Sequence, residues 1–254
     1  IDIDKFMIPQ KEAISQTAFY AVAVFIATVV EIPGRALFQI VNPLVAKALN
    51  TDNFTELKKL YKESSLNLLI ISGLFFLLIN LNIVPFYELM DNPSYGTAVW
   101  VVLMISLSKL ILMSFGCGPA ILATSKFYKI TLPFSIGMAF SVYFLNDYLI
   151  DLMGINGAAL STLIVVAIFT FLKIIYIKSK LNLSPYSSNS VKTLLIIGSL
   201  FLIFENISLP FKGAGLIIIN SLITVLVYTL VVYYSNLSAT LNKFIMKVLN
   251  KLRF

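Results

Sequence analysis

The sequence predicts an all-α integral membrane protein, and the composition and the lengths of the apolar runs carry that prediction. Hydrophobic residues make up 59% of the 254 residues and charged residues only 12%, against roughly 45–50% and 25% in soluble domains. A helix that crosses the roughly 30 Å hydrocarbon layer of a bilayer needs about 20 mostly apolar residues. Runs of this length recur along the chain, so we expect a bundle of about seven transmembrane helices.

The first of the seven apolar runs differs from the others in length and in proline content. As one straight helix, residues 13–49 would extend about 55 Å, so we expect a bend at Pro33 or Pro43, or an end that protrudes from the bilayer. The segment 50–63 is polar and basic with a weak apolar stripe, and we expect a separate surface helix there. The remaining runs, separated by turn-forming residues, are 64–84, 97–123, 130–150, 155–177, 191–209 and 213–234.

Two short segments flank this transmembrane lobe of residues 13–234. The chain opens in the middle of a motif and without a start methionine, so we expect residues 1–12 to be the end of a preceding transmembrane helix with an external loop. In the tail, 235–254, apolar residues fall on one side and lysines largely on the other. That pattern is typical of an amphipathic helix at a membrane interface, with a solvated basic tail as the alternative.

The net charge of +7 is distributed by loop and does not gather on one face. Basic segments alternate with segments poor in lysine at every crossing, as the positive-inside rule requires. We therefore expect the basic loops and the C-terminus to face the cytoplasm. This distribution argues against nucleic acid as a partner.

Several chemistries lack the residues that they need. The sequence has no histidine and one cysteine, Cys117, which excludes imidazole metal sites and catalysis by a Ser-His-Asp or Cys-His arrangement. It has no glycine-rich phosphate loop ending in Lys-Ser/Thr. The acidic residues form no convincing pair for acid–base catalysis, and no segment is long enough for an external catalytic domain. We expect neither enzymatic activity, nor a metal, nor a cofactor.

Three ionisable residues stand inside apolar runs, where a charge is costly and usually faces a cavity or a partner. Glu31 and Arg35 are four residues apart and therefore share one helix face. Lys109 lies near the middle of the run 97–123. One interpretation is a water-filled cavity in which Arg35 and Lys109 bind an anionic substrate, with Glu31 beside them. The other is a set of structural ion pairs, with Lys109 extending its amino group toward the interface.

Several stretches resemble the oligosaccharide flippases of the multidrug/oligosaccharidyl-lipid/polysaccharide exporter superfamily. The resemblance covers nearly the whole chain and is closest to the polysaccharide branch, which serves glycans such as the O-antigen of lipopolysaccharide. The matching stretches are Asp4–Ile8, the proline-containing Ile32–Ala46, Leu57–Ser65, Ala123–Lys129, Leu145–Asn146 and Gly154–Ala159.

The resemblance implies the second lobe of a two-lobe (MATE-like) transporter, whose missing N-terminal lobe would be its partner. It implies that lipid-linked oligosaccharide on undecaprenyl pyrophosphate is flipped across the inner membrane by alternating access, alongside other polysaccharide assembly proteins. Arg35 and Lys109 would then meet the pyrophosphate or acidic sugars. Proton or sodium coupling stays open. The alternatives are a multidrug exporter of the same superfamily, a membrane-embedded polysaccharide polymerase or transferase, and a lobe without transport activity.

Overall fold

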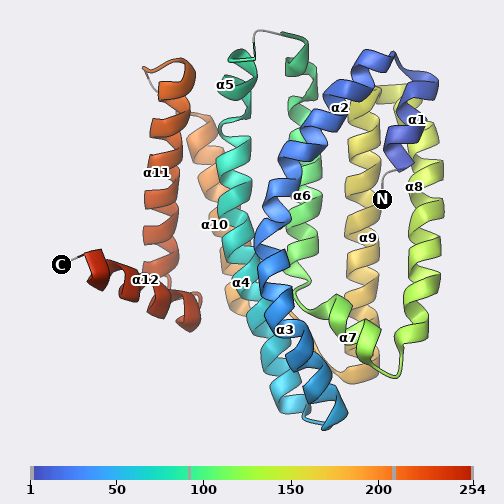
Figure 1. Ribbon diagram of the computed structural model, residues 1–254, viewed down its shortest axis with the longest axis vertical. Helices are drawn as coiled ribbons and strands as arrows, with labels where there is room; N and C mark the ends of the chain where they lie inside the picture. The colour runs from blue at the N-terminus through green and yellow to red at the C-terminus, as the bar shows by residue number, and fades with distance from the viewer. Residues whose placement is uncertain (1–2, 91–92, 208–209, 253–254) are drawn as a thin grey trace.

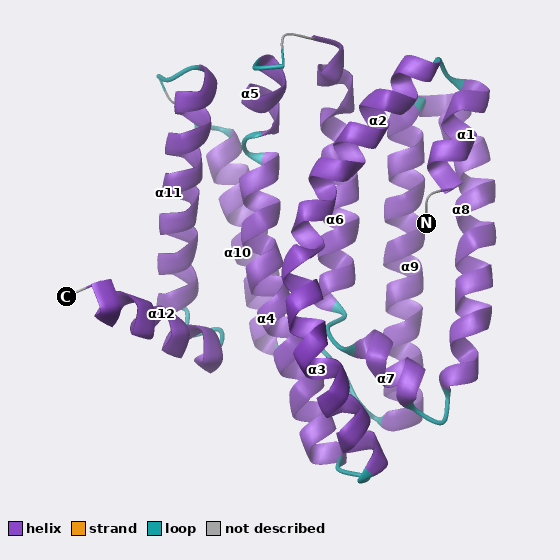
Figure 2. Cartoon of the chain, in the orientation of Figure 1, coloured by secondary structure: helices purple, strands orange, loops and turns teal. Residues whose placement is uncertain are grey.

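A bundle of long helices makes up the protein (Figures 1 and 2). The computed structural model describes residues 3–90, 93–207 and 210–252. Four short segments lie outside the described part: residues 1–2 of the predicted first segment, 91–92 of an external loop, 208–209 of the sixth run and 253–254 of the tail. The long α-helices are α1 (Ile3–Lys11), α2 (Ile14–Ala27), α3 (Ile32–Asn50), α4 (Phe54–Asn80), α6 (Val99–Ser114), α8 (Thr131–Met153), α9 (Ile155–Leu181), α10 (Ser188–Glu205), α11 (Gly213–Tyr234) and α12 (Ala239–Leu252). The shorter pieces are α5 (Ile83–Glu88), α7 (Gly118–Thr124), and the 3-10 turns η1 (Thr28–Glu31), η2 (Pro93–Ala98) and η3 (Tyr128–Ile130).

The predicted all-α membrane bundle is confirmed. Within the described ranges, seven helical stretches are long and apolar enough to cross a membrane, and no strand occurs. The protein is therefore a multi-pass membrane protein. The seven stretches are Ile14–Asn50, Phe54–Asn80, Ser94–Ser114, Tyr128–Met153, Ile155–Leu181, Ser188–Glu205 and Gly213–Tyr234.

The first span bends where the sequence predicts. The α-helix α2 gives way to the 3-10 turn η1, and α3 then begins at Ile32 (Figure 1). Pro33 lies in the first turn of α3, where its missing N–H group leaves no hydrogen bond unmade. Pro43 sits inside α3 without ending it. The bend places Glu31, the last residue of η1, at the joint between the two halves of the span.

The separate surface helix predicted for 50–63 is wrong. Asn50 ends α3, residues 51–53 make the turn, and residues 54–63 form the first turns of α4, which runs unbroken from Phe54 to Asn80. Asn53 caps the helix, its side-chain oxygen accepting a hydrogen bond from the Glu56 N–H at 3.1 Å, and no proline interrupts α4, whose single glycine, Gly73, lies well inside the span. Leu57 and Tyr61 are fully buried against α3 and α7. The polar residues are thus a solvent-side extension of the second span.

The third apolar run ends at Ser114, earlier than its composition predicts. Gly116 adopts a φ of +56° and turns the chain into the short helix α7. A Cβ at Gly116 would lie 2.6 Å from the backbone nitrogen of Ser65 on α4, so only glycine fits this close approach. The Ser64 hydroxyl accepts a hydrogen bond from the N–H of Cys117 at 3.0 Å, and Cys117 is fully buried.

Charge separates between the two ends of the bundle. Because consecutive spans alternate in direction (Figure 1), the lysines of the α3–α4, α7–α8 and α9–α10 connections gather at one end. Glu88, Asp147, Asp151 and Glu205 lie toward the other end. The helix α12 starts at the basic end and leads away from the bundle (Figure 1).

Small residues let α8 and α9 form a tight antiparallel pair. Gly154, with a φ of +57°, makes the turn between them, and its N–H donates to the carbonyl oxygen of Ile150 at 2.8 Å. A Cβ at Gly157 would overlap the carbonyl group of Leu149. The Gly154–Ala159 stretch therefore sets how closely the first turn of α9 approaches the last turns of α8.

Substituting Gly157→Ala tests this contact. We expect a loss of about 1–3 kcal/mol of unfolding free energy, because the new methyl group has to displace backbone atoms. The measurement is thermal unfolding of the detergent-solubilised protein. Gly198→Ala on α10 is the control, since its Cβ would meet no atom within 4 Å, and it should unfold at the same or a slightly higher temperature. Equal behaviour of the two variants would contradict the proposed close packing.

Candidate functional site

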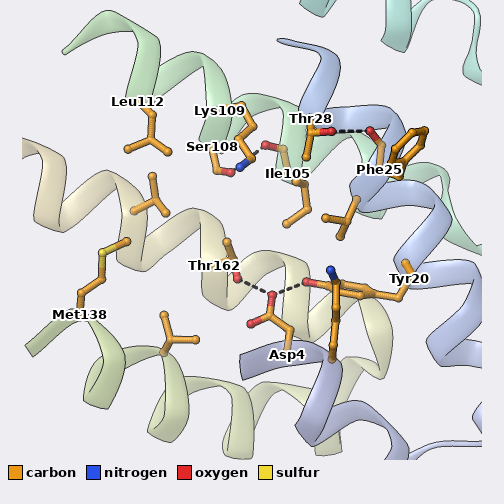
Figure 3. A pocket seen from close by; sticks show the side chains of 15 residues that line it. Asp4, Tyr20, Phe25, Thr28, Ile105, Ser108, Lys109, Leu112, Met138 and Thr162 are labelled. Carbon is orange, nitrogen blue, oxygen red and sulfur yellow. Dashed lines mark hydrogen bonds between the residues drawn. The ribbon is translucent and has the colours of Figure 1, made fainter. Parts of the chain in front are cut away.

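A cavity of about 440 Å³ lies among α1, α2, α6, α8 and α9 (Figure 3). Four of these helices belong to apolar spans, so the cavity opens inside the bundle. Its wall mixes apolar side chains with ionisable and hydroxyl groups. The polar lining residues are Asp4, Lys5, Tyr20, Thr28, Ser108, Lys109 and Thr162.

Asp4 is a buried carboxylate that receives hydrogen bonds from three other helices. It comes from α1 and is only 4% exposed. Tyr20 of α2 donates to Oδ2 at 2.5 Å, Thr162 of α9 donates to the same oxygen at 3.0 Å, and Asn146 of α8 donates to Oδ1 at 3.1 Å. The two hydroxyl groups and the amide group supply hydrogen-bond donors to both carboxyl oxygens of Asp4, which satisfies this buried group. Figure 3 shows the Tyr20 and Thr162 bonds at the edge of the cavity.

Glu31 stands between the two cationic residues that the sequence singles out. Its Oε2 lies 3.0 Å from Nζ of Lys109 on α6, and its Oε1 lies 3.4 Å from a guanidinium nitrogen of Arg35. The Lys109 and Glu31 side chains are 23% and 22% exposed, whereas Arg35 is 71% exposed. Lys109 therefore both lines the cavity and has an ion-pair partner 78 positions away in the sequence.

Arg35 is not among the residues that line the cavity. It extends from the first turns of α3 to the outside of the bundle, and its contact with Glu31 is long for a charge-assisted hydrogen bond. Glu31 does not line the cavity either, but the structure brings it into contact with Lys109 and leaves Arg35 exposed at the periphery. The bend at η1 is what turns the Glu31 carboxylate toward α6.

The charged site that the sequence reasoning missed is the Asp4 cluster. Asp4 lies near the start of the chain, outside every long apolar run, so a search for charges within such runs passes over it. The signal that could have found it is the pattern of apolar residues around it, since Met7 and Ile8 are buried on the same short helix. Its partners lie on three separate helices and share no local pattern with it.

The sequence reasoning also missed a cluster of ion pairs between α1 and α8, at the acidic end of the bundle. Nζ of Lys11, at the end of α1, lies 2.6 Å from Oδ1 of Asp147 and 3.0 Å from Oδ2 of Asp151, both on α8. The hydrogen bond to Asp147 raises the pKa of Lys11 above its ordinary value. Because Asp4 and Lys11 both contact α8, the two ends of α1 are each attached to that helix by polar side chains.

A double-mutant cycle on Glu31 and Lys109 tests the ion pair at the cavity. For Glu31→Gln, Lys109→Gln and the double variant, we expect a coupling free energy of about 1–3 kcal/mol, since the pair is charge-assisted and largely shielded from solvent. The measurement is unfolding free energy in mixed detergent. The control cycle pairs Glu31→Gln with Arg35→Gln and should give a coupling below about 0.5 kcal/mol, because Arg35 is exposed. Equal couplings in the two cycles would contradict this description of the site.

The comparisons with known proteins give no relative on which a function could rest. No protein-family model, no curated protein and no solved structure matches this chain. In the described part of the chain, no three His, Cys, Asp or Glu side chains gather in a way that could hold a metal ion. The function therefore has to be argued from the geometry and charge of the cavity.

Proposed function

We propose that this protein transports an anionic, lipid-linked substrate across the membrane, as a flippase for oligosaccharides carried on undecaprenyl pyrophosphate. The resemblance described from the sequence motifs names this substrate, and the cavity supplies a reason for it. Alternating access would expose the cavity first to one side of the membrane and then to the other. The proposed location is the bacterial inner membrane.

The observation that carries the proposal is the amino group of Lys109 in a cavity between apolar spans. Ionisable residues at such positions are costly and mark substrate or ion pathways. A pyrophosphate offers several acceptor oxygens, and a lysine away from bulk water binds such a group as a point charge. Glu31 supports the proposal in a second way, because it compensates the lysine charge while no substrate is bound.

The distribution of lysines supports an orientation in which the basic end of the bundle faces the cytoplasm. In that orientation α12 and the C-terminus are cytoplasmic, and the Lys11–Asp147 cluster faces the periplasm. A substrate assembled in the cytoplasm would then enter the cavity from the end where the positive charge gathers. That charge would also raise the local concentration of an anionic substrate.

Asp4 gives the proposal a source of energy coupling. A carboxylate in the same cavity as Lys109 is a candidate site for the coupling cation, a proton or a sodium ion. Its hydrogen bonds from α2, α8 and α9 connect this site to three helices of the cavity wall. We propose that a cation taken up at Asp4 drives the change of access.

Asp4 also supports the second candidate, a multidrug exporter. A carboxylate in the cavity favours an amphipathic cation, and the Lys109 amino group opposes it. Because the lysine has the Glu31 carboxylate beside it, the balance of charge near Lys109 does not exclude a cationic substrate. The two candidates differ in the charge of the substrate, so one experiment separates them.

The deciding experiment expresses the intact gene in a host strain that lacks its own O-antigen or capsule flippase. Restored surface glycan, detected by immunoblot of cell-surface polysaccharide, supports the flippase. Unchanged glycan together with new resistance to cationic drugs supports the multidrug exporter. An empty vector is the negative control for surface glycan, and the host's own flippase gene is the positive control.

Charge-neutralising variants of Glu31 and Lys109 test whether Lys109 binds substrate or only forms an ion pair with Glu31. Lys109→Gln should reduce surface glycan at least about tenfold, because a desolvated charge-assisted contact to pyrophosphate is lost. The double variant Lys109→Gln with Glu31→Gln removes both charges and therefore the unpaired carboxylate. If the lysine binds substrate, the double variant stays inactive. Recovery of export in the double variant would show that the pair is only structural.

Arg35→Gln is the matched control for that series. It removes a cation one helical turn from Glu31 but outside the cavity. We expect glycan export to fall by less than about threefold, in keeping with the weak coupling of an exposed pair. Protein levels in the membrane, measured by immunoblot, have to be equal in all variants.

A further inference from the structure

A second cavity, of about 360 Å³, lies on the other side of the bundle. It is formed by the break between α4 and α5 together with α6, α10 and α11, and it shares no lining residue with the cavity of Figure 3. Most of its wall is aliphatic or aromatic, with Trp100, Phe201 and Phe204 as the largest side chains. Trp100 is 61% exposed and Glu205 is exposed as well, so the cavity is open at its edge.

The polar groups of this cavity present oxygens. The 27-residue helix α4 ends at Asn80, and the last carbonyl groups of a helix carry a partial negative charge. The Asn80 amide group donates to the carbonyl oxygen of Phe76 at 2.8 Å and to the Ser106 hydroxyl at 2.9 Å. Its oxygen, which is screened from water, has no hydrogen-bond partner within the described structure.

Asn220 of α11 uses its donor group in the same way. Its amide nitrogen donates to the carbonyl oxygen of Leu81 at 3.0 Å and to the side-chain oxygen of Asn82 at 3.2 Å. The carboxylate of Glu205 adds a full negative charge. Among the described residues that line this cavity, none is a lysine or an arginine. The donors are thus used within the protein. Three of the last carbonyl groups of α4 also accept hydrogen bonds, Leu77 from the Leu81 N–H, Leu78 from the Asn82 amide and Ile79 from the Asn82 N–H. Among the lining residues, the Asn80 side-chain oxygen and the Glu205 carboxylate remain available as acceptors.

We propose that this cavity binds an organic ammonium group carried on an apolar chain. Glu205 would pair with the ammonium, the carbonyl end of α4 would add to the favourable potential, and the aromatic rings would contact the cation and its chain. Two sources share this chemistry: an aminophospholipid of the bilayer and a free alkylammonium compound.

Trp100 reports on this site because it is the one tryptophan of the 254-residue sequence and lines the cavity. The protein is placed in phosphatidylcholine vesicles that contain either brominated phosphatidylethanolamine or brominated phosphatidylglycerol with the same chains. Bromine quenches tryptophan fluorescence on contact, so a preference for one headgroup appears as stronger quenching. In a second arm, dodecylammonium or dodecyl sulfate is added to vesicles without brominated lipid, and the shift of Trp100 emission is recorded.

Glu205→Gln and Glu88→Gln provide the matched pair of variants. Both carboxylates lie at the same end of the bundle, but Glu88 is not a lining residue. Because Glu205 is exposed, its substitution should leave folding intact, which the elution profile of the purified protein checks. We expect a preference for the ammonium probe that falls about threefold in Glu205→Gln, as for an exposed charge pair, and stays unchanged in Glu88→Gln.

The two arms distinguish the sources. Preferential quenching by phosphatidylethanolamine assigns the site to a bilayer lipid. A response to dodecylammonium alone, again dependent on Glu205, assigns it to free amphiphiles. No preference for either ammonium probe, or a preference that persists fully in Glu205→Gln, would overturn the proposal.

Discussion

The Asp4 carboxylate joins two pairs of consecutive helices that are far apart in the sequence. It lies on α1, and its donors come from the neighbouring α2 and from α8 and α9, up to 158 positions away. A carboxylate that is only 4% exposed is tolerable where hydrogen-bond donors converge on it. The packing of α1 against α8 and the position of the cavity wall both depend on that convergence.

The two cavities differ in how they treat charge. In the first, acidic and basic side chains lie in the same space, and the Lys109 charge is balanced by Glu31 across the joint between α2 and α3. In the second, the donors are satisfied within the protein and acceptors remain. The bundle therefore offers separate environments for an anionic and for a cationic group, built from the ends and bends of helices more than from whole helical faces.

Run length and composition predict the class of fold and the seven spans, because the length of an apolar helix is set by the thickness of the bilayer. The boundaries that depend on tertiary contacts are predicted less well. The composition of residues 50–63 predicts a separate surface helix, whereas in the structure Leu57 and Tyr61 pack on α3 and α7. The break at Gly116 lies in an apolar run where Gly116, Gly118 and Pro119 are turn-forming residues, and glycine is required there by the proximity of the α4 backbone.

The site shows the same division. Glu31, Arg35 and Lys109 are visible in the sequence as charges within apolar runs, but their relative roles depend on the bend at η1, which directs Glu31 toward α6 and leaves Arg35 outside. Asp4 carries no such signal, because it lies outside the long apolar runs and its role arises from residues on three other helices. Spacing along one helix can predict a pair at i and i+4, and it cannot predict a contact between helices.

The burial of Cys117 makes the protein suitable for mapping its membrane topology with introduced cysteines. This thiol is fully buried beneath α4 and α7, and burial raises its pKa to about 11. Thiol reagents attack the thiolate, so at neutral pH the native sequence is nearly inert toward maleimides. A single cysteine introduced at the end of any span would react alone, and membrane-impermeant reagents would then report on which side of the bilayer that end lies.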